Sequence, residues 1–391
     1  VSQDFLNAVV NYPLLKGSQT NLFKCFLPLS WRLASHQGCQ GFLHPEGVYD
    51  DPKGGALREV LYGRLRNHFQ FQNEFQLFSG TNDHGRLRFG LNIYGSTQNP
   101  SFIHVSNLFT PLTVDRCFEH DGSGAAGGIK NEEGKWNVAG HRQRLIPVGE
   151  KSLGLFAQLY DEPGTPDSEA RLPALHSQQL QGVLEKFAAT PKRLGDLKGD
   201  YYATVMWDET NAVKKDGTIR RDTSFPTDPS ELVLSGPHFY VGRPFNKTPR
   251  RSCTANSHYD CLDLTTLPDD YLPRTNYRPD VKASEYRSRT PKTPWDKDKL
   301  VTDHYRVIHR KRLSQSGERT LIASLVPPGT AHVHPVITTC TESIRKTIDL
   351  CSLLSSIPFD FFVKTTGKSD LSTGDLKNFP IEILHDSDKS F

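Results

Sequence analysis

The chain has 391 residues, of which 36% are apolar and 23% charged, and its net charge is only +3. A chain of this length can bury the cores of two domains, and its 22 Phe and 13 Tyr are too many for a disordered protein. It has no run of about 20 apolar residues and no basic-then-apolar start, so we expect neither a membrane partner nor secretion, but a cytoplasmic protein with seven reduced cysteines.

The first hundred residues alternate between helical and strand-like patterns. Leu57, Val60, Leu61 and Leu65 share one face of a predicted helix, with Arg58 expected on the opposite face. The predicted elements are a helix over 22–33 interrupted at Pro28, a strand over 41–49, a helix over 54–66, and strands over 69–78 and 86–94 joined by a turn at 80–85. This order is typical of the last part of an α/β domain.

Beyond residue 100 the pattern is less regular. Residues 122–140 are rich in glycine and polar side chains, which predicts a loop. A helix is expected over 168–189 with a break near Pro173, and short strands with long loops over 194–335. A last helix over 342–355 precedes an aromatic segment, 359–363, that we expect to be buried.

Three motifs suggest specific chemistry, and each has a simpler explanation. Gly122, Gly124 and Gly127 match the spacing of a nucleotide-binding turn, but no strand precedes them and no helix pattern follows, which favours a flexible loop. The cysteines and histidines near residues 253–261 and 332–334 lack the paired spacing of a zinc site, so we predict no metal. Asp280 and Glu285 echo a metal-dependent nuclease, which remains an alternative.

Positive charge is concentrated in one part of the chain. Residues 243–320 hold 17 Lys and Arg against 10 Asp and Glu, an excess of +7 that the remaining residues offset. Within this segment, Arg and Lys alternate with Phe, Pro and Tyr, as in loops that grip phosphates. Arg and Asn are also the side chains that contact guanine and adenine edges. The pattern indicates a nucleic-acid partner, although a solvated charged loop would look similar.

Several segments in order resemble large adenine-specific DNA methyltransferases of restriction-modification and phage-defence systems. The stretches GFLHPEGVYDD at 41–51, Leu57-Arg58 and FQFQNE at 69–74 resemble the later strands of the methyltransferase domain. The stretches that resemble the target-recognition domain are SGPHFYVG at 235–242, LPRTNY at 272–277, RTLIASLVPPG at 319–329 and LLSSIPFDFF at 353–362.

The resemblance implies an α/β fold: an incomplete Rossmann-like methyltransferase sheet over residues 1–115, followed by a loop-rich α+β target-recognition domain over 116–391. It also implies methyl transfer from S-adenosylmethionine to an adenine flipped out of the duplex. The family's cofactor loop and its Asn/Asp-Pro-Pro-aromatic catalytic tetrapeptide are absent, and the only Pro-Pro is Pro327-Pro328. We therefore predict no catalytic residue here and a chain inactive alone: a fragment, a split gene product or a degraded copy.

The expected partners are double-stranded DNA and a missing N-terminal methyltransferase portion or a catalytic subunit. An alternative is a standalone specificity subunit that acts with separately encoded catalysis. The turn His44-Pro45-Glu46 is expected at the carboxyl end of a strand, where it could border the adenine pocket or serve as a tight turn only. The predicted DNA contacts are Lys247, Arg250, Arg251, Arg310 and Arg312 to phosphates, and Arg274, Asn276 or Arg278 to bases.

Overall fold

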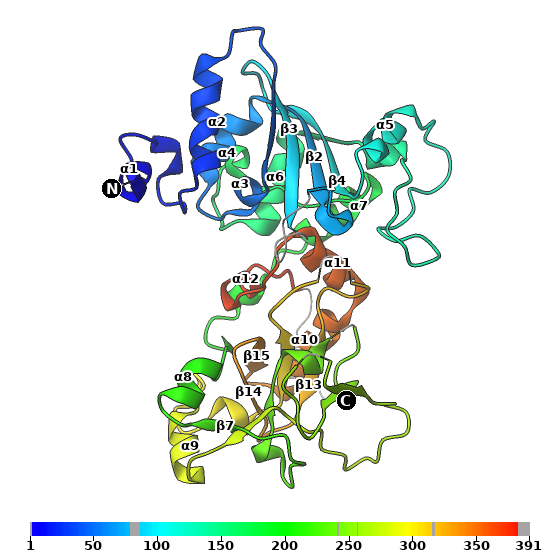
Figure 1. The fold of residues 1–391 in the computed structure, drawn as a ribbon. Coiled ribbons are helices and arrows are strands. Elements are labelled where there is room, and N and C mark those ends of the chain that lie inside the picture. The colour runs from blue at the N-terminus through cyan, green and yellow to red at the C-terminus, as the bar shows by residue number, and fades with distance from the viewer. Residues whose placement is uncertain (1, 79–86, 241, 256, 315–316, 382–391) are drawn as a thin grey trace. The chain divides into compact units, whose positions relative to one another are not determined.

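A computed structural model describes residues 2–78, 87–240, 242–255, 257–314 and 317–381 (Figure 1). The fold is mixed α/β, as predicted. The chain divides into two compact units: the first ends at Ala189, and the second begins at Thr190, with Thr365–Gly367 belonging to the first. In the described residues no helix has the length and apolar character needed to cross a membrane.

The division differs from the predicted boundary after residue 115, which lies inside the first unit. The physical reason is that later segments complete the same sheet and its cover. The strand at Ile146–Gly149 adds to the sheet edge by pairing with Ser101–Leu108, and the helix at Glu150–Tyr160 follows it. Sequence periodicity shows where a strand is, but it does not show which sheet the strand joins.

The first unit is built on a five-stranded sheet with the order β1-β3-β2-β4-β5. Its strands are β1 (Gln40–Pro45), β2 (Leu65–Gln72), β3 (Arg88–Tyr94), β4 (Ser101–Leu108) and β5 (Ile146–Gly149). β3 lies between β1 and β2 and is antiparallel to both, while β2 and β4 are parallel. The strands β1, β2 and β4 therefore run in one direction and end at the same edge of the sheet.

Helices surround this sheet (Figure 1). They are α1 (Ser2–Asn7), α2 (Leu22–Leu33), α3 (Gly47–Asp50), α4 (Gly55–Tyr62), α5 (Leu112–Glu119), α6 (Glu150–Tyr160) and α7 (Gln179–Ala188), with short 3-10 turns at Pro13–Leu15, Asn73–Phe75, Arg142–Arg144 and Asp167–Glu169. The core beneath them includes Leu61, Tyr62, Val105 and Phe156, all nearly inaccessible to solvent.

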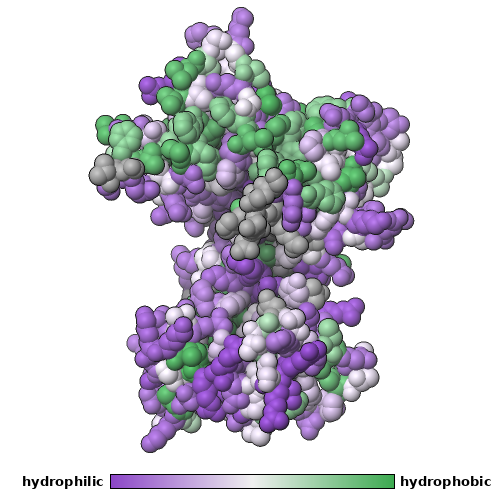
Figure 2. Space-filling view, in the orientation of Figure 1, coloured by the Kyte–Doolittle hydropathy of each residue, from purple (hydrophilic) through white to green (hydrophobic). Residues whose placement is uncertain are grey.

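Helix α2 is apolar on two faces. Cys25, Leu27 and Trp31 point into the unit, and the helix continues through Pro28. Exposed apolar side chains recur on the outside at Leu22, Phe26, Leu29 and Leu33. Figure 2 shows apolar residues gathered on the visible face of this unit. Together with β1, which is an edge strand of the described sheet, this face leaves apolar surface of the unit uncovered.

The second unit has short strands and long connections, as the sequence predicts. One sheet has the order β13-β12-β15-β6, another β14-β8-β11-β7, and β9 and β10 form a two-stranded ribbon. The strands are β6 (Tyr201–Thr204), β7 (Ile219–Arg221), β8 (Val233–Leu234), β9 (Lys247–Pro249), β10 (Tyr259–Cys261), β11 (Tyr277–Pro279), β12 (Arg306–Arg310), β13 (Ala323–Val326), β14 (Ala331–His332) and β15 (Val336–Thr341).

Most helices of the second unit come late in the sequence, after residue 340. They are α8 (Glu209–Lys214), α9 (Ala283–Arg289), α10 (Ile344–Ser355), α11 (Ile357–Thr365) and α12 (Thr373–Leu376), with 3-10 turns at Leu194–Asp196, Pro229–Glu231, Gly236–Phe239 and Val301–Asp303. The predicted helix over 342–355 is confirmed. The aromatic segment is buried at Phe359, Phe362 and Val363, as expected, within the residues of α11.

Other predicted elements need correction. The strand expected over 41–49 ends at Pro45, because Glu46 begins a turn in which the Tyr49 amide donates to the Glu46 carbonyl. The helix expected over 168–189 begins only at Gln179, and residues 122–140 form a loop as predicted. The turn predicted at 80–85 lies outside the described residues.

Arg58 is also not on the solvent side of α4. It is 1% exposed and donates to the main-chain carbonyls of Val48, Asp51 and Glu169.

Candidate nucleic-acid interface

Two of the predicted DNA-binding cations face the same aromatic ring in the second unit. Tyr240 is 41% exposed, and the Lys247 ammonium lies 4.7 Å from its ring centroid. The Arg310 guanidinium lies 5.0 Å from the same centroid. Lys247 comes from β9 and Arg310 from β12, so the fold brings together residues 63 positions apart. We call Tyr240, Lys247 and Arg310 the Tyr240 cluster.

A second set forms around Phe225, which is 52% exposed. The Arg274 guanidinium lies 4.0 Å from the Phe225 ring centroid, and Arg278 donates to the Phe225 carbonyl at 2.9 Å. Arg278 is also paired with Glu231 at 2.7 Å. Within the part of the chain that the structure describes, no carboxylate forms an ion pair with Arg274. We call Phe225, Arg274 and Arg278 the Phe225 cluster.

A buried histidine connects the two clusters. His238 is fully buried and is joined to the Arg274 carbonyl through its Nε2 atom, at 2.9 Å. Burial lowers the pKa of His238, which favours the neutral ring; the Nε2 atom then carries the proton and donates to the carbonyl. Because Tyr240 follows His238 by two residues, the His238 ring fixes the backbone of one cluster beside the other.

The remaining predicted phosphate contacts lie on exposed segments. Arg250 and Arg251 follow β9 directly, and Arg312 follows β12. Arg250 forms an exposed ion pair with Asp260 on β10, at 2.8 Å. Such a pair is worth little in free energy, so the guanidinium can exchange Asp260 for a phosphate at small cost.

Asn276 does not fit its predicted role as a base contact. Its side chain is 7% exposed, and its amide nitrogen donates to the Tyr259 hydroxyl and, at 3.4 Å, to the Ser235 hydroxyl. The amide is used to hold β10 and the turn after β8 together. A sequence window shows that asparagine can bind adenine, but it does not show which way the side chain points.

The turn His44-Pro45-Glu46 lies at the carboxyl end of β1, as predicted, but its polar side chains face inward. His44 is 5% exposed, stacks on Phe23 at 5.4 Å and reaches the Tyr94 hydroxyl at 3.0 Å. Glu46 is also 5% exposed, and its two oxygens are bonded by His68 Nε2 at 3.0 Å and Gln70 Nε2 at 2.9 Å.

These contacts are part of a buried polar network that the sequence reasoning missed. His68 Nδ1 lies 2.9 Å from His104 Nδ1 across the parallel strands β2 and β4. In the same network, the Tyr49 hydroxyl donates to Asn92 Oδ1 at 2.6 Å. The signal was present in β2, where His68, Gln70 and Gln72 alternate with Phe side chains and so share one face of the strand. The strand predicted over 69–78 left His68 outside it.

Burial and hydrogen bonding shift the pKa values of Glu46 and His104 and so set their charge states at neutral pH. Burial by itself would raise the pKa of Glu46, but the charge and hydrogen bond of His68 and the Gln70 amide outweigh it and lower the pKa to about 2. Burial, reinforced by His68, lowers the pKa of His104 to about 3. At neutral pH the structure therefore holds a carboxylate at Glu46 and a neutral ring at His104.

The nuclease alternative finds no support in the geometry. Asp280 pairs with Arg220 at 3.0 Å, and Glu285 pairs with Arg289 at 2.5 Å on its own helix. Each carboxylate thus faces its own arginine. Among the described residues no three His, Cys, Asp or Glu side chains come together as metal ligands would.

No protein-family model matches this chain, and no curated protein matches it either. Among solved structures, the chain is similar to the type IIG restriction endonuclease BpuSI, with 12% sequence identity and a TM-score of 0.30. The match covers 97% of this chain and 44% of that protein, so the chain spans less than half its length.

Proposed function

We propose that the second unit binds double-stranded DNA through the Tyr240 and Phe225 clusters. The observation that carries the proposal is that three cations lie against two exposed aromatic rings. Lys247 and Arg310, from separate strands, lie against Tyr240, and Arg274, from a loop, lies against Phe225. His238 joins the two segments. Buried or fully paired cations would stabilise only the fold. Half-buried cations such as Lys247, Arg274 and Arg310, placed against exposed rings, can hold phosphates while the rings stack on sugars or bases.

The biological role in this proposal is sequence recognition for an adenine-specific DNA methyltransferase of a restriction-modification or phage-defence system. Its support is the ordered series of sequence resemblances, in both units. S-adenosylmethionine and the catalytic tetrapeptide belong to a methyltransferase portion or subunit that acts with this chain, which is inactive alone. The first unit then adds strands to the methyltransferase sheet. His44 and Glu46, being buried, support the wall of the adenine pocket and do not touch the base.

Within the second unit we assign different roles to the predicted contacts. Lys247, Arg250, Arg251, Arg310 and Arg312 bind phosphates. Arg274 reads a base, because no carboxylate of the described residues pairs with its guanidinium, which lies on an exposed ring. Arg278 instead orders the Phe225 loop through Glu231.

The test is the salt dependence of duplex binding by the purified chain, measured by fluorescence anisotropy on a labelled duplex of about 25 base pairs. Removing one phosphate contact lowers the slope of log affinity against log salt by about 0.9. Arg250→Ala should therefore flatten the slope by that amount and weaken binding to all sequences alike.

A matched control is Arg287→Ala on α9. Arg287 is an exposed arginine of the same unit and is paired with Asp303 at 3.1 Å, much as Arg250 is paired with Asp260. Equal effects of the two substitutions, or no duplex binding at low salt, would contradict the proposed interface.

A further inference from the structure

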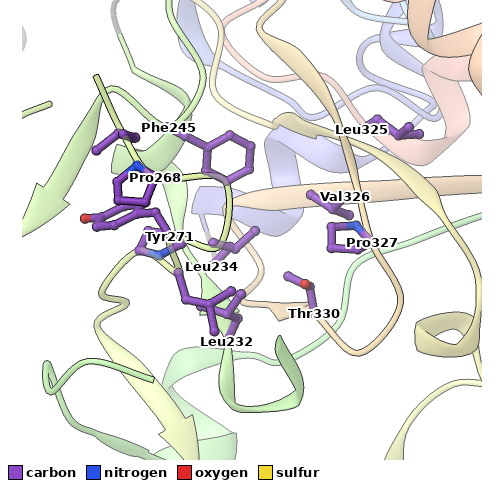
Figure 3. A pocket seen from close by; sticks show the side chains of 12 residues that line it. Leu232, Leu234, Phe245, Pro268, Tyr271, Leu325, Val326, Pro327 and Thr330 are labelled. Carbon is purple, nitrogen blue, oxygen red and sulfur yellow. The ribbon is translucent and has the colours of Figure 1, made fainter. Parts of the chain in front are cut away.

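The second unit contains an apolar pocket of about 260 Å³ that none of the contacts above uses (Figure 3). It lies between the loop at residues 267–273, the strands β8 and β13, and the turn that holds Phe245. A cavity of about 150 Å³ is enough for a benzene ring, so this one has room for a planar group of one or two rings.

The lining of the pocket combines rings with aliphatic side chains. Figure 3 shows Phe245 and Pro268 on one side and Val326 and Pro327 on the other. The Phe245 ring offers a planar face on which a planar ligand can stack, and the aliphatic side chains around it exclude water.

Polar groups are few in the lining. Among the described residues that line the pocket, side-chain oxygens occur only in Tyr271, whose hydroxyl points away in Figure 3, and Thr330. Thr330 is 2% exposed, and none of the described residues forms a hydrogen bond with its hydroxyl. A buried hydroxyl without a partner costs free energy in the empty protein, and it can both donate to and accept from a ligand.

One wall of the pocket is also strained. Phe245 has a φ of +63°, in the left-handed region that an aromatic residue rarely adopts. The conformation is held by its amide, which donates to the His238 carbonyl at 2.7 Å, and by the Phe239 ring at 5.2 Å. Strain of this kind is concentrated at ligand-binding sites, where it fixes a side chain in the position that binding needs.

One residue of the lining, Phe245, belongs to the segment that carries Lys247. Lys247 lies two residues beyond Phe245, and His238, which holds Phe245 in place, also joins the two clusters. A ligand that places a flat ring in the pocket and an anionic backbone at Lys247 meets both features at once.

We propose that this pocket receives an unstacked nucleobase from the DNA held by the Tyr240 cluster. The ring lies against Phe245 and Pro327, and its polar edge meets the Thr330 hydroxyl. This inference rests on the proposed function, because the phosphates at Lys247 bring the base to the pocket. It adds a base-binding site that is separate from the Arg274 contact and from any catalytic pocket.

The experiment compares a single-stranded oligonucleotide of 12 thymidines with an abasic strand of the same length. Both carry the same phosphates, and only one carries bases. Base stacking on protein rings contributes about 1 to 3 kcal/mol per base, so wild-type protein should bind the thymidine strand about 5- to 160-fold more tightly.

The pocket is then filled by Leu272→Trp, in the loop wall, and its hydroxyl is removed by Thr330→Val, which keeps the side-chain shape. We expect Leu272→Trp to reduce the preference for the thymidine strand at least fivefold and Thr330→Val to reduce it less. Binding of the abasic strand and the melting temperature should stay unchanged. Leu264→Trp is the control, because Leu264 is exposed and lies outside the pocket lining.

The outcomes separate the two proposals. A thymidine preference that survives both Leu272→Trp and Thr330→Val overturns the base pocket and leaves the DNA interface standing. Failure to bind the labelled duplex of about 25 base pairs at low salt overturns the DNA interface, and the pocket assignment with it. Duplex binding without any preference of the wild-type protein for the thymidine strand overturns the pocket alone. If Leu272→Trp unfolds the protein, the result with Thr330→Val decides.

Discussion

The two units use their charged side chains in opposite ways. In the first unit the Glu46 carboxylate is buried and bonded to His68, which in turn meets the neutral His104 ring. In the second unit Lys247, Arg274 and Arg310 lie around rings that face solvent. The difference is also visible in Figure 2, where the visible face of the second unit is mostly hydrophilic. A charge that is buried and paired stabilises the fold, and a charge beside an exposed ring is available to a ligand.

The largest expected effect is the removal of the buried carboxylate. Glu46→Ala leaves His68 and Gln70 without their acceptor inside the first unit and should lower the free energy of unfolding by about 3 to 5 kcal/mol. The change in the free energy of unfolding is measured by urea unfolding, followed by circular dichroism. The control is Glu133→Ala, which breaks an ion pair with Lys135 on the surface of the same unit and should change little. If Glu46→Ala and Glu133→Ala lower the free energy of unfolding by similar amounts, the buried carboxylate contributes no more to stability than an exposed one.

Acid should destabilise the first unit through the same network. The folded pKa of His104 is about 3, below its ordinary value of 6.5, so the unfolded chain takes up a proton first as the pH falls. The contribution of His104 to the free energy of unfolding is therefore complete above pH 6.5, and it is lost progressively as the pH falls from 6.5 to about 3. The folded pKa of Glu46, about 2, adds a further loss below its ordinary value of 4.5.

Urea midpoints measured between pH 7 and pH 4.5 test this linkage. His104→Gln should make the midpoint less dependent on pH, whereas the exposed His36→Gln should leave the dependence as it is in wild type. An unchanged slope in His104→Gln would show that other groups control the acid response.

Arg274→Ala probes sequence reading in the second unit. If the guanidinium makes a bidentate base contact, its loss should relax the preference at one base pair by about 1 to 3 kcal/mol and leave the salt slope almost unchanged. Sequencing of duplexes selected from a random pool measures the preference at every position. A uniform loss over all positions would make Arg274 a phosphate contact instead.

The smallest expected effect is at the exposed pair of Arg250 and Asp260, whose side chains are 57% and 52% exposed. Asp260→Asn should change the free energy of unfolding by less than about 1 kcal/mol. It should strengthen duplex binding by no more than about fivefold, since it frees Arg250 and removes a negative charge beside a phosphate. Weaker binding of Asp260→Asn would show that Asp260 positions Arg250 for DNA.

Much of the local structure was predictable from the sequence. The helices near residues 22–33 and 342–355, the strand ending near Tyr94, and the short strands after residue 194 follow from apolar spacing and from glycine and proline. The strand predicted over 69–78 is Leu65–Gln72 in the structure, and the helix predicted over 54–66 ends at Tyr62. The candidate DNA surface was predictable as a list of cations. Phe225 and Tyr240 were not on that list, because a ring becomes part of such a surface only through the strands that place cations beside it.

The sequence by itself determined the mixed α/β class, the basic middle segment and the position of the turn at Pro45, because these depend on neighbours along the chain. Tertiary structure decided the unit boundary at Ala189, the inward direction of Asn276 and Arg58, and the meeting of His68 with His104. Each of these depends on which segments pack together, and the free energy of burying a polar group is set by partners that lie far away in sequence.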